Sequence, residues 1–535
     1  MPQAIVSGSA RKTRKLLLPL AAGAALVGLG LVVLLVIRWP FRQEAVLKAL
    51  EEASLTRVNS RAFHGTYFPH PGCVLENVTF QHNPKAGTPP LITVERLEIE
   101  GGFTGLFTSH LSRIRAEGMR LLIPAPGSGE HFQTPERSTF VVDEIVADGT
   151  VLEVASGEPN DKPLTFFFHG FTLSDVGSKG PATFHAKLSN PEPPGEITTE
   201  GKFGPWSTED VGKTQVSGQY VFQHADLGVF PGIGGLLSSS GKFTGVLNHI
   251  DVEGDTEVPR FFTTVSTHQV DLKTKFRAVV DGENGDTFLQ QVNATFWKTT
   301  VSSQGSVAKG TGHAGKTVSL QIATTAGRIQ DILLLFAQSK RAPMSGLVSF
   351  TAKVSIPPER RPFLAKVTME GDFGIDAGGF TKAETQQGVN KLSEGARGED
   401  HREPEKGEAD PETVLSDLRG HVLLMNGTAR FSNLSFSVPG ALAQLQGTYN
   451  LINEKIDLRG TLKTKSDVSK TTQGVKALVL KVLDPFFKKK SIGYVVPVKI
   501  TGTYEHPFFG LDLADKRNKK STDGTAASGS SDPRP

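Results

Sequence analysis

Short segments in which apolar and polar residues alternate recur through most of this chain. A period of two is that of a β-strand with one apolar and one polar face. The clearest apolar sets are Val318, Leu320 and Ile322; Leu434, Phe436 and Val438; Ile456, Leu458 and Leu462; and Val496, Val498 and Ile500. Gly, Asn, Asp and Pro separate the segments, and helical crossovers at regular spacing are absent. The pattern therefore predicts a mainly β protein with antiparallel strands.

The length of the β-rich body restricts its architecture further. Single domains rarely exceed about 250 to 300 residues, so the roughly 500 residues after Ile37 predict several sandwiches or one elongated sheet. The composition has 33 Phe against 5 Tyr and 3 Trp, which adds aromatic area without a polar group. This apolar aromatic area has two interpretations: the phenylalanines fill an ordinary core, or they line a groove that holds an apolar ligand.

An uncharged apolar run extends from Leu16 to Ile37 and includes Leu26 and Leu31. As a helix it would be about 33 Å long, close to a hydrocarbon core of about 30 Å. Signal peptides have a shorter apolar region of about 7 to 15 residues, and no A-x-A cleavage site stands directly before the charged flank at Arg38. We therefore expect a retained transmembrane helix, with a cleaved signal peptide and a buried core helix as the alternatives.

Basic residues flank this run on both sides, but those before it are more tightly clustered: Arg11, Lys12, Arg14 and Lys15. Long domains cross the membrane largely regardless of their charge, so the cluster favours a cytoplasmic amino terminus. We expect a cytoplasmic tail at residues 1–15, a single membrane span at 16–37 and a body on the opposite side.

Three segments have helical spacing. Glu44 to Ala53 and Arg328 to Lys340 are the first two. The third contains Leu478, Val482 and Phe486 and ends in Lys488, Lys489 and Lys490. Such a helix can lie on an anionic membrane or cap an apolar groove, or it can be a core helix whose lysines complement its dipole. The charged stretch 381–413 is expected to be a disordered linker or insertion, and 514–535 a disordered tail.

No motif supports catalysis, a cofactor or a metal. Gly310 to Thr317 fits the P-loop expression, but Val318, Leu320 and Ile322 after it predict a strand where a P-loop requires a helix. His64, His70 and Cys73 match no zinc spacing, and Cys73 is the only cysteine. A net charge of +3 argues against a dedicated nucleic-acid binder. We expect a protein that is not an enzyme.

Both ends of the chain resemble the AsmA-like family, whose members include TamB. At the carboxyl end the resemblance lies in a strand with Asn426-Gly427, a turn at Gly447 to Leu451 and a closing Pro-Val-x-Ile-x-Gly from Pro497. At the amino end it lies in the apolar run, the helix after it and the segment FHGTYFPHPGCVLENVTF from Phe63. The resemblance implies an AsmA-like N-terminal region at 38–125, a β-rich middle region at 139–380 and an AsmA-like C-terminal region at 419–513.

The resemblance also implies a fold and a function. The fold is an elongated, curved antiparallel sheet, a groove or half-pipe with an apolar inner face and a few short amphipathic helices. The function is phospholipid transport or outer-envelope maintenance by a periplasmic body held in the inner membrane, with an outer-membrane or periplasmic protein as a further partner. The groove candidates are Val318, Leu320, Ile322, Leu434, Phe436 and Val438. The alternative is a scaffold or assembly factor for outer-membrane proteins that carries no lipid.

Overall fold

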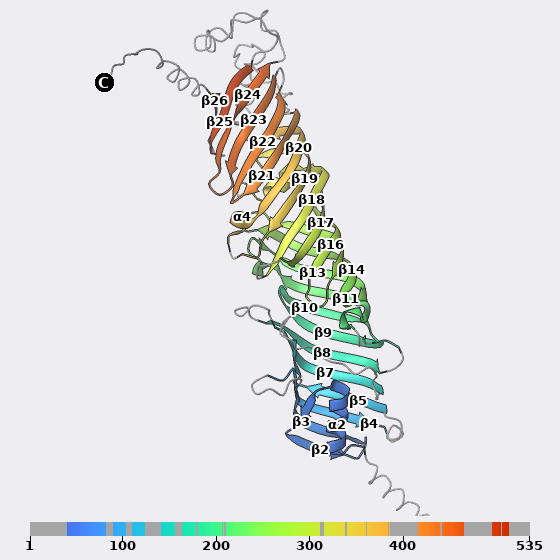
Figure 1. Ribbon diagram of the computed structural model, residues 1–535. Coiled ribbons are helices and arrows are strands. Elements are labelled where there is room, and N and C mark those ends of the chain that lie inside the picture. Colours follow the sequence, from blue (N-terminus) through green and yellow to red (C-terminus); the bar gives the residue numbers. More distant parts are fainter. Residues whose placement is uncertain are drawn as a thin grey trace, which may run out of the picture. The chain divides into compact units, whose positions relative to one another are not determined.

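The computed structural model describes residues 40–81, 89–102, 110–123, 141–155, 163–177, 180–205, 207, 210–310, 315–336, 340–359, 361–382, 385, 416–438, 441–464, 495–503 and 506–512. These residues form 26 strands of one mixed sheet and few helices, which confirms the prediction of a mainly β protein (Figure 1). They divide into two compact units, Met1–Pro191 with Thr198–Gln215, and Glu192–Ile197 with Val216–Pro535.

Several predicted segments lie outside the described residues. These are the transmembrane helix with Leu16, Leu26, Leu31 and Ile37, the third helix with Leu478, Val482, Phe486, Lys488, Lys489 and Lys490, the tail 514–535 and nearly all of the linker 381–413. No helix within the described ranges is both long and apolar enough to span a membrane.

Among its described residues, the first unit contains one helix and the strands that follow it. They are α2 (Gln43–Ser54), β1 (Arg57–Asn59), β2 (Ala62–Thr66), β3 (Gly72–Gln81), β4 (Ile92–Gly101), β5 (His110–Glu117), β6 (Arg120–Ile123), β7 (Val141–Val154), β8 (Leu164–Val176) and β9 (Ala182–Pro191). The strand β10 (Pro194–Phe203) contributes residues to both units, and a 3-10 turn follows at Val211–Lys213.

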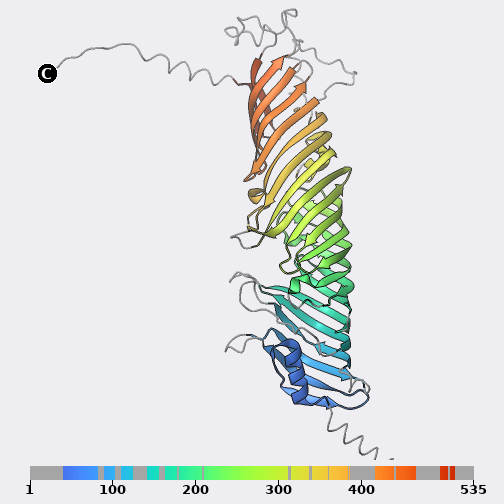
Figure 2. The same cartoon turned by 45° about the vertical axis from the view of Figure 1, so that its right-hand side comes forward.

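The core of the first unit lies between α2 and the strands that follow it. Figure 2 shows the helix lying against these strands. Val46 is buried, and Leu47 and Leu50 pack beside it against a cluster that includes Leu75 and Val78. These α2 residues recur at helical spacing and share one face of the helix. The amphipathic helix predicted for Glu44 to Ala53 is therefore confirmed.

The expectation of a purely antiparallel sheet is wrong for this unit. β7 runs parallel to β5 and to β6, with His110 opposite Val141 and Arg120 opposite Val151. A parallel pair needs a connection of about a dozen residues or more, and 17 residues separate Ile123 from Val141. Alternation of side chains defines the two faces of a strand but carries no information about its direction.

The second unit begins with β11 (Gln215–Asp226) and continues through a 3-10 turn (Leu227–Val229). Its further elements are β12 (Ile233–Gly234), β13 (Leu236–Val246), β14 (His249–Thr263), β15 (Val270–Val280), β16 (Thr287–Phe296), β17 (Thr299–Lys309), β18 (Lys316–Arg328), α3 (Ile329–Leu334), β19 (Met344–Ile356), α4 (Phe363–Lys366), β20 (Thr368–Phe380), β21 (Ser416–Met425), β22 (Thr428–Val438), β23 (Ala441–Asn450), β24 (Lys455–Thr464), β25 (Val495–Thr503) and β26 (Pro507–Leu511).

From β13 to β26 every strand pairs antiparallel with the next one in the chain. Figure 1 shows these strands following one another in chain order. The predicted antiparallel meander is therefore confirmed for β13 to β26. The helix predicted from Arg328 is present as α3, which is shorter than its sequence pattern.

Candidate functional site

Cross-strand register places most apolar residues of β13 to β26 on one face of the sheet. Directly opposite residues of antiparallel strands point to the same side. Phe243 lies opposite Val252, which lies opposite Ala278, which in turn lies opposite Leu289. Later strands continue this succession. Leu320 lies opposite Val354, Val354 lies opposite Met369, and Met369 lies opposite Leu424. We call this side of the second unit the apolar face.

Two β-bulges keep the apolar face continuous where simple alternation would break it. Leu289 and Val292 are three positions apart, yet they lie opposite Ala278 and Phe276, because an extra residue is inserted between them. Phe431 and Leu434 are related in the same way, opposite Gly447 and Leu445. In both places the bulge returns the next apolar side chain to the same side of the sheet.

All six groove candidates lie on the apolar face, but in two different environments. Leu434, Phe436 and Val438 are only 8%, 7% and 5% exposed and belong to a cluster with residues of β19 to β25. Val318, Leu320 and Ile322 are half-buried.

The three clusters of buried apolar residues in the described chain include no residue of β13 to β18. Along the middle of these strands the apolar side chains, such as Phe243, Val252, Phe276 and Val301, are half-buried too. We call the apolar face of β13 to β18 the open segment. It is a continuous apolar surface. Ala278, Val258 and Phe296 on this surface are buried, at 3%, 2% and 7% exposed, but none of them joins a cluster like the one that fills the face of β19 to β25.

The short helix α3 covers part of the apolar face beside the open segment. Ile329 is buried in the cluster that contains Leu434, and Ile332 and Leu333 pack against that cluster. Asp331 is 7% exposed, and its Oδ2 accepts hydrogen bonds from the Lys298 amide at 3.1 Å and the Thr299 hydroxyl at 2.8 Å. The buried carboxylate therefore ties α3 to the turn between β16 and β17.

The other end of α3 is held by the connection between β14 and β15. The Ser266 hydroxyl donates to the Leu334 carbonyl at 2.7 Å, and the Thr263 hydroxyl donates to the Leu335 carbonyl. These carbonyls belong to the last turn of the helix, where no amide of the helix reaches them. Both ends of α3 are thus fixed by hydrogen bonds to neighbouring strands.

The apolar face is also bridged from its two edges by α4 and the loop that carries β12. The β12 loop lies where β14 ends, because Ile233 pairs with Thr263. α4 joins β19 to β20 at the opposite edge, and Phe363 packs against a buried cluster that includes Leu424 and Ala429 of the apolar face. A Cβ built on Gly232 would lie 2.8 Å from the Phe363 Cβ, so the two segments are in direct contact. Gly232 has a φ of +105°, a conformation that glycine adopts readily.

The opposite face of the sheet is polar and charged. β14 and β15 form a ladder in which Glu253, Asp255 and Glu257 lie opposite Arg277, Lys275 and Lys273. The hydrogen bond from Lys273 to Glu257 raises the pKa of that lysine. Exposed pairs of this kind contribute little stability each, but their order favours the observed pairing of the two strands.

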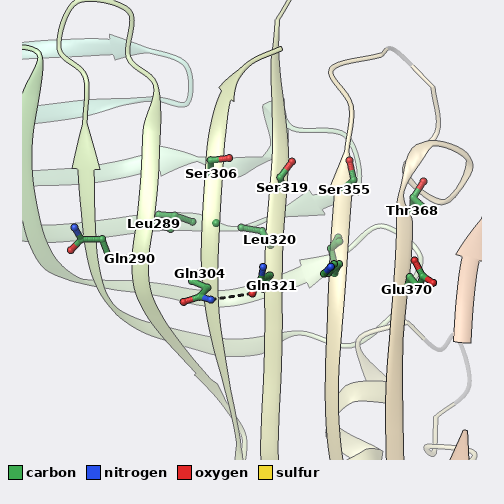
Figure 3. Close-up of a pocket in the computed structure, with 13 residues that line it drawn as sticks. Leu289, Gln290, Gln304, Ser306, Ser319, Leu320, Gln321, Ser355, Thr368 and Glu370 are labelled. Atoms are coloured by element: carbon green, nitrogen blue, oxygen red, sulfur yellow. Dashed lines mark hydrogen bonds between the residues drawn. The ribbon is translucent and has the colours of Figure 1, made fainter. Parts of the chain in front are cut away.

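Two adjoining depressions of about 640 and 600 Å³ are lined mainly by residues of the polar face of β16 to β20 (Figure 3). One row consists of Gln304, Gln321, Lys353 and Glu370, which lie opposite one another on successive strands. Gln304 donates a hydrogen bond to Gln321 at 3.1 Å. Figure 3 shows Ser306, Ser319 and Ser355 in a second row beside it. Sequence reasoning missed this surface because its residues are near one another only across strands.

The P-loop expression does not have the structure that phosphate binding requires. β18 begins at Lys316, so a strand follows the motif as predicted. The Lys316 ammonium lies 3.3 Å from Asp286 and donates to the Asn284 carbonyl at 3.0 Å. In the described residues from Lys316 onward, a strand takes the place of the helix N-terminus whose amides would bind a phosphate.

The candidate metal ligands do not converge. Cys73 is 1% exposed, and burial raises the pKa of its thiol to about 12. Gly65, not His64, lies opposite Cys73, so the His64 side chain is on the other face of the sheet. His64 and His70 are exposed. Within the described ranges no group of three or more His, Cys, Asp or Glu side chains could hold a metal ion.

Comparison with known proteins gave no match to a family model, a curated protein or a solved structure.

We predict that Asp331→Ala lowers the free energy of unfolding by about 1 to 3 kcal/mol, because it leaves the Thr299 hydroxyl and the Lys298 amide without their acceptor. Urea unfolding of the full-length chain followed by circular dichroism measures this loss. Asp251→Ala, which removes an exposed carboxylate of the polar face, is the matched control and should change little. Equal effects of the two substitutions would mean that Asp331 does not hold α3.

Proposed function

We propose that this chain is an inner-membrane-anchored periplasmic protein whose open segment binds phospholipid acyl chains and takes part in their transport. The observation that carries the proposal is the open segment, a continuous apolar surface that no cluster of described residues fills. The predicted membrane span at 16–37 and the AsmA-like resemblance of both ends agree with it.

Acyl chains fit the physical character of this surface. Each CH₂ group removed from water contributes about 0.8 kcal/mol, so a chain of about 16 carbons gains on the order of 10 kcal/mol before ordering costs. The open segment offers Val, Leu, Ile and Phe side chains with few polar groups, among them Ser303 opposite Ile322. The hydrophobic effect is not directional, so a chain could slide along such a surface without breaking specific bonds.

The head group of a bound phospholipid would remain in water at the edge of the sheet, because its charge opposes burial. The proposal requires no catalytic residue and no cofactor. It implies three partners: the inner membrane, a phospholipid, and an outer-membrane or periplasmic protein. A direction of transport would have to come from such a protein or from a difference in lipid content between membranes.

A photo-crosslinking experiment tests the proposal with the full-length chain in cells. The photoreactive residue p-benzoylphenylalanine is placed at Ile322, on the open segment, and in a second strain at Gln321, on the polar face one position away. With lipids labelled by radioactive phosphate, we expect a labelled adduct at position 322 and severalfold less at 321. Absence of label at 322, or equal label at both positions, would contradict lipid binding and favour a scaffold that carries no lipid.

A charge on the open segment should weaken lipid binding. Ile322→Asp should strongly reduce lipid adducts at a probe placed at Val318, because a carboxylate disfavours an acyl chain beside it, while the circular dichroism spectrum stays native. Gln321→Asp is the control and should leave the adducts unchanged. Phe436→Asp cannot make this distinction, because Phe436 is 7% exposed and a buried unpaired charge would unfold the protein. Normal adducts in the Ile322→Asp chain would contradict the assignment of the open segment as the lipid site.

A further inference from the structure

The turn between β2 and β3 carries the two most exposed large apolar side chains among the described residues. Phe68 is 87% exposed and Tyr67 is 66% exposed. Both lie in the segment Tyr67–His70, and His70 at its end is exposed as well. We call Tyr67 and Phe68 the aromatic tip. A phenyl ring held almost fully in water is unfavourable, so an aromatic tip of this kind indicates a contact with an apolar partner.

The aromatic tip lies beside the point where the chain enters the first unit. The Phe41 ring approaches Gly101 so closely that a Cβ built there would lie 3.0 Å from it. The Gly101 amide donates to the Pro71 carbonyl at 2.8 Å, which fixes the base of the turn next to Phe41. Phe41 is itself 7% exposed and packs in the core of this unit. Phe41, where the chain enters the first unit, and the base of the turn at Pro71 are therefore held next to each other.

Chain length then limits the distance between the aromatic tip and the predicted membrane span. Four residues lead from Ile37, the last residue of that span, to Phe41, and three lead from Pro71 back to Phe68. At about 3.5 Å per residue, these segments reach at most roughly 14 and 11 Å. If residues 16–37 cross a bilayer, the tip lies within reach of its head groups.

The chemistry of the tip fits that region of a bilayer. Tyrosine and tryptophan are enriched at membrane interfaces, where the ring meets acyl chains and the polar group meets water. Phenylalanine is common on the apolar side of segments that lie in the interface. A protein partner would bury the same rings, but the nearby predicted span makes the bilayer the partner that the sequence itself provides.

We propose that the aromatic tip inserts into the surface of the membrane that holds residues 16–37. This second contact would prevent the first unit from pivoting freely on its single span. The inference rests on the anchoring part of the proposed function and is independent of lipid binding by the open segment.

A fluorescent probe at position 68 tests this inference in the full-length chain. Cys73 reacts poorly because it is buried and its pKa is about 12, so Phe68→Cys can be labelled selectively with the environment-sensitive dye NBD. The control is Leu164→Cys, an apolar residue of the same unit that is 45% exposed. Leu164 lies opposite Val154 at the end of β7, far from the strand ends beside the aromatic tip.

The labelled chains are reconstituted in vesicles of phosphatidylethanolamine and phosphatidylglycerol, and flotation first verifies membrane attachment. We expect blue-shifted emission and severalfold quenching by doxyl-labelled lipid at position 68, but neither at 164.

A probe at Tyr67→Cys should lose its blue shift when Phe68→Asp is added, which excludes insertion by the dye alone. A chain that floats while position 68 behaves like 164 would overturn the inference, as would a chain that does not float. Photo-crosslinking at Ile322 reports separately on the open segment.

Discussion

The architecture of the second unit depends on cross-strand register that keeps apolar side chains on one side from β13 to β26. A slip of one residue in any strand would turn its apolar side chains to the opposite face. The bulges at Leu289 to Val292 and at Phe431 to Leu434 act within this constraint, because each restores the correct side after an extra residue. The charge ladder of β14 and β15 opposes a shift of register on the other face.

The same register produces surfaces of different character because the covering elements differ. Beyond β18, α3 and the strands up to β25 enclose Leu434 and Phe436 in a cluster. Over β13 to β18 no such cluster forms, and Ile322 stays half-buried. The contact of Phe363 with Gly232 bridges the two edges of the sheet on the apolar side. An apolar surface that is bridged in one place but not filled is suited to holding a long flexible ligand.

Sequence alone predicted the strands and the apolar side of β18 and β22, because period-two alternation reflects local geometry directly. It could not distinguish Phe436 from Ile322, since both follow the same pattern and differ only in what covers them. It missed the parallel direction of β7 because alternation is the same in either direction. It also missed the role of Asp331, whose partners Lys298 and Thr299 lie on another strand connection. The polar depressions likewise arise only from residues brought together across strands.

We propose that lipid, and not protein, occupies the apolar surface of the open segment. An electron cryo-microscopy map of the full-length chain in a lipid nanodisc, at a resolution that shows side chains, tests it most directly. We expect elongated density, unconnected to the polypeptide, alongside Val318, Leu320 and Ile322. A map in which these side chains pack against other protein segments, with no such density, would contradict it.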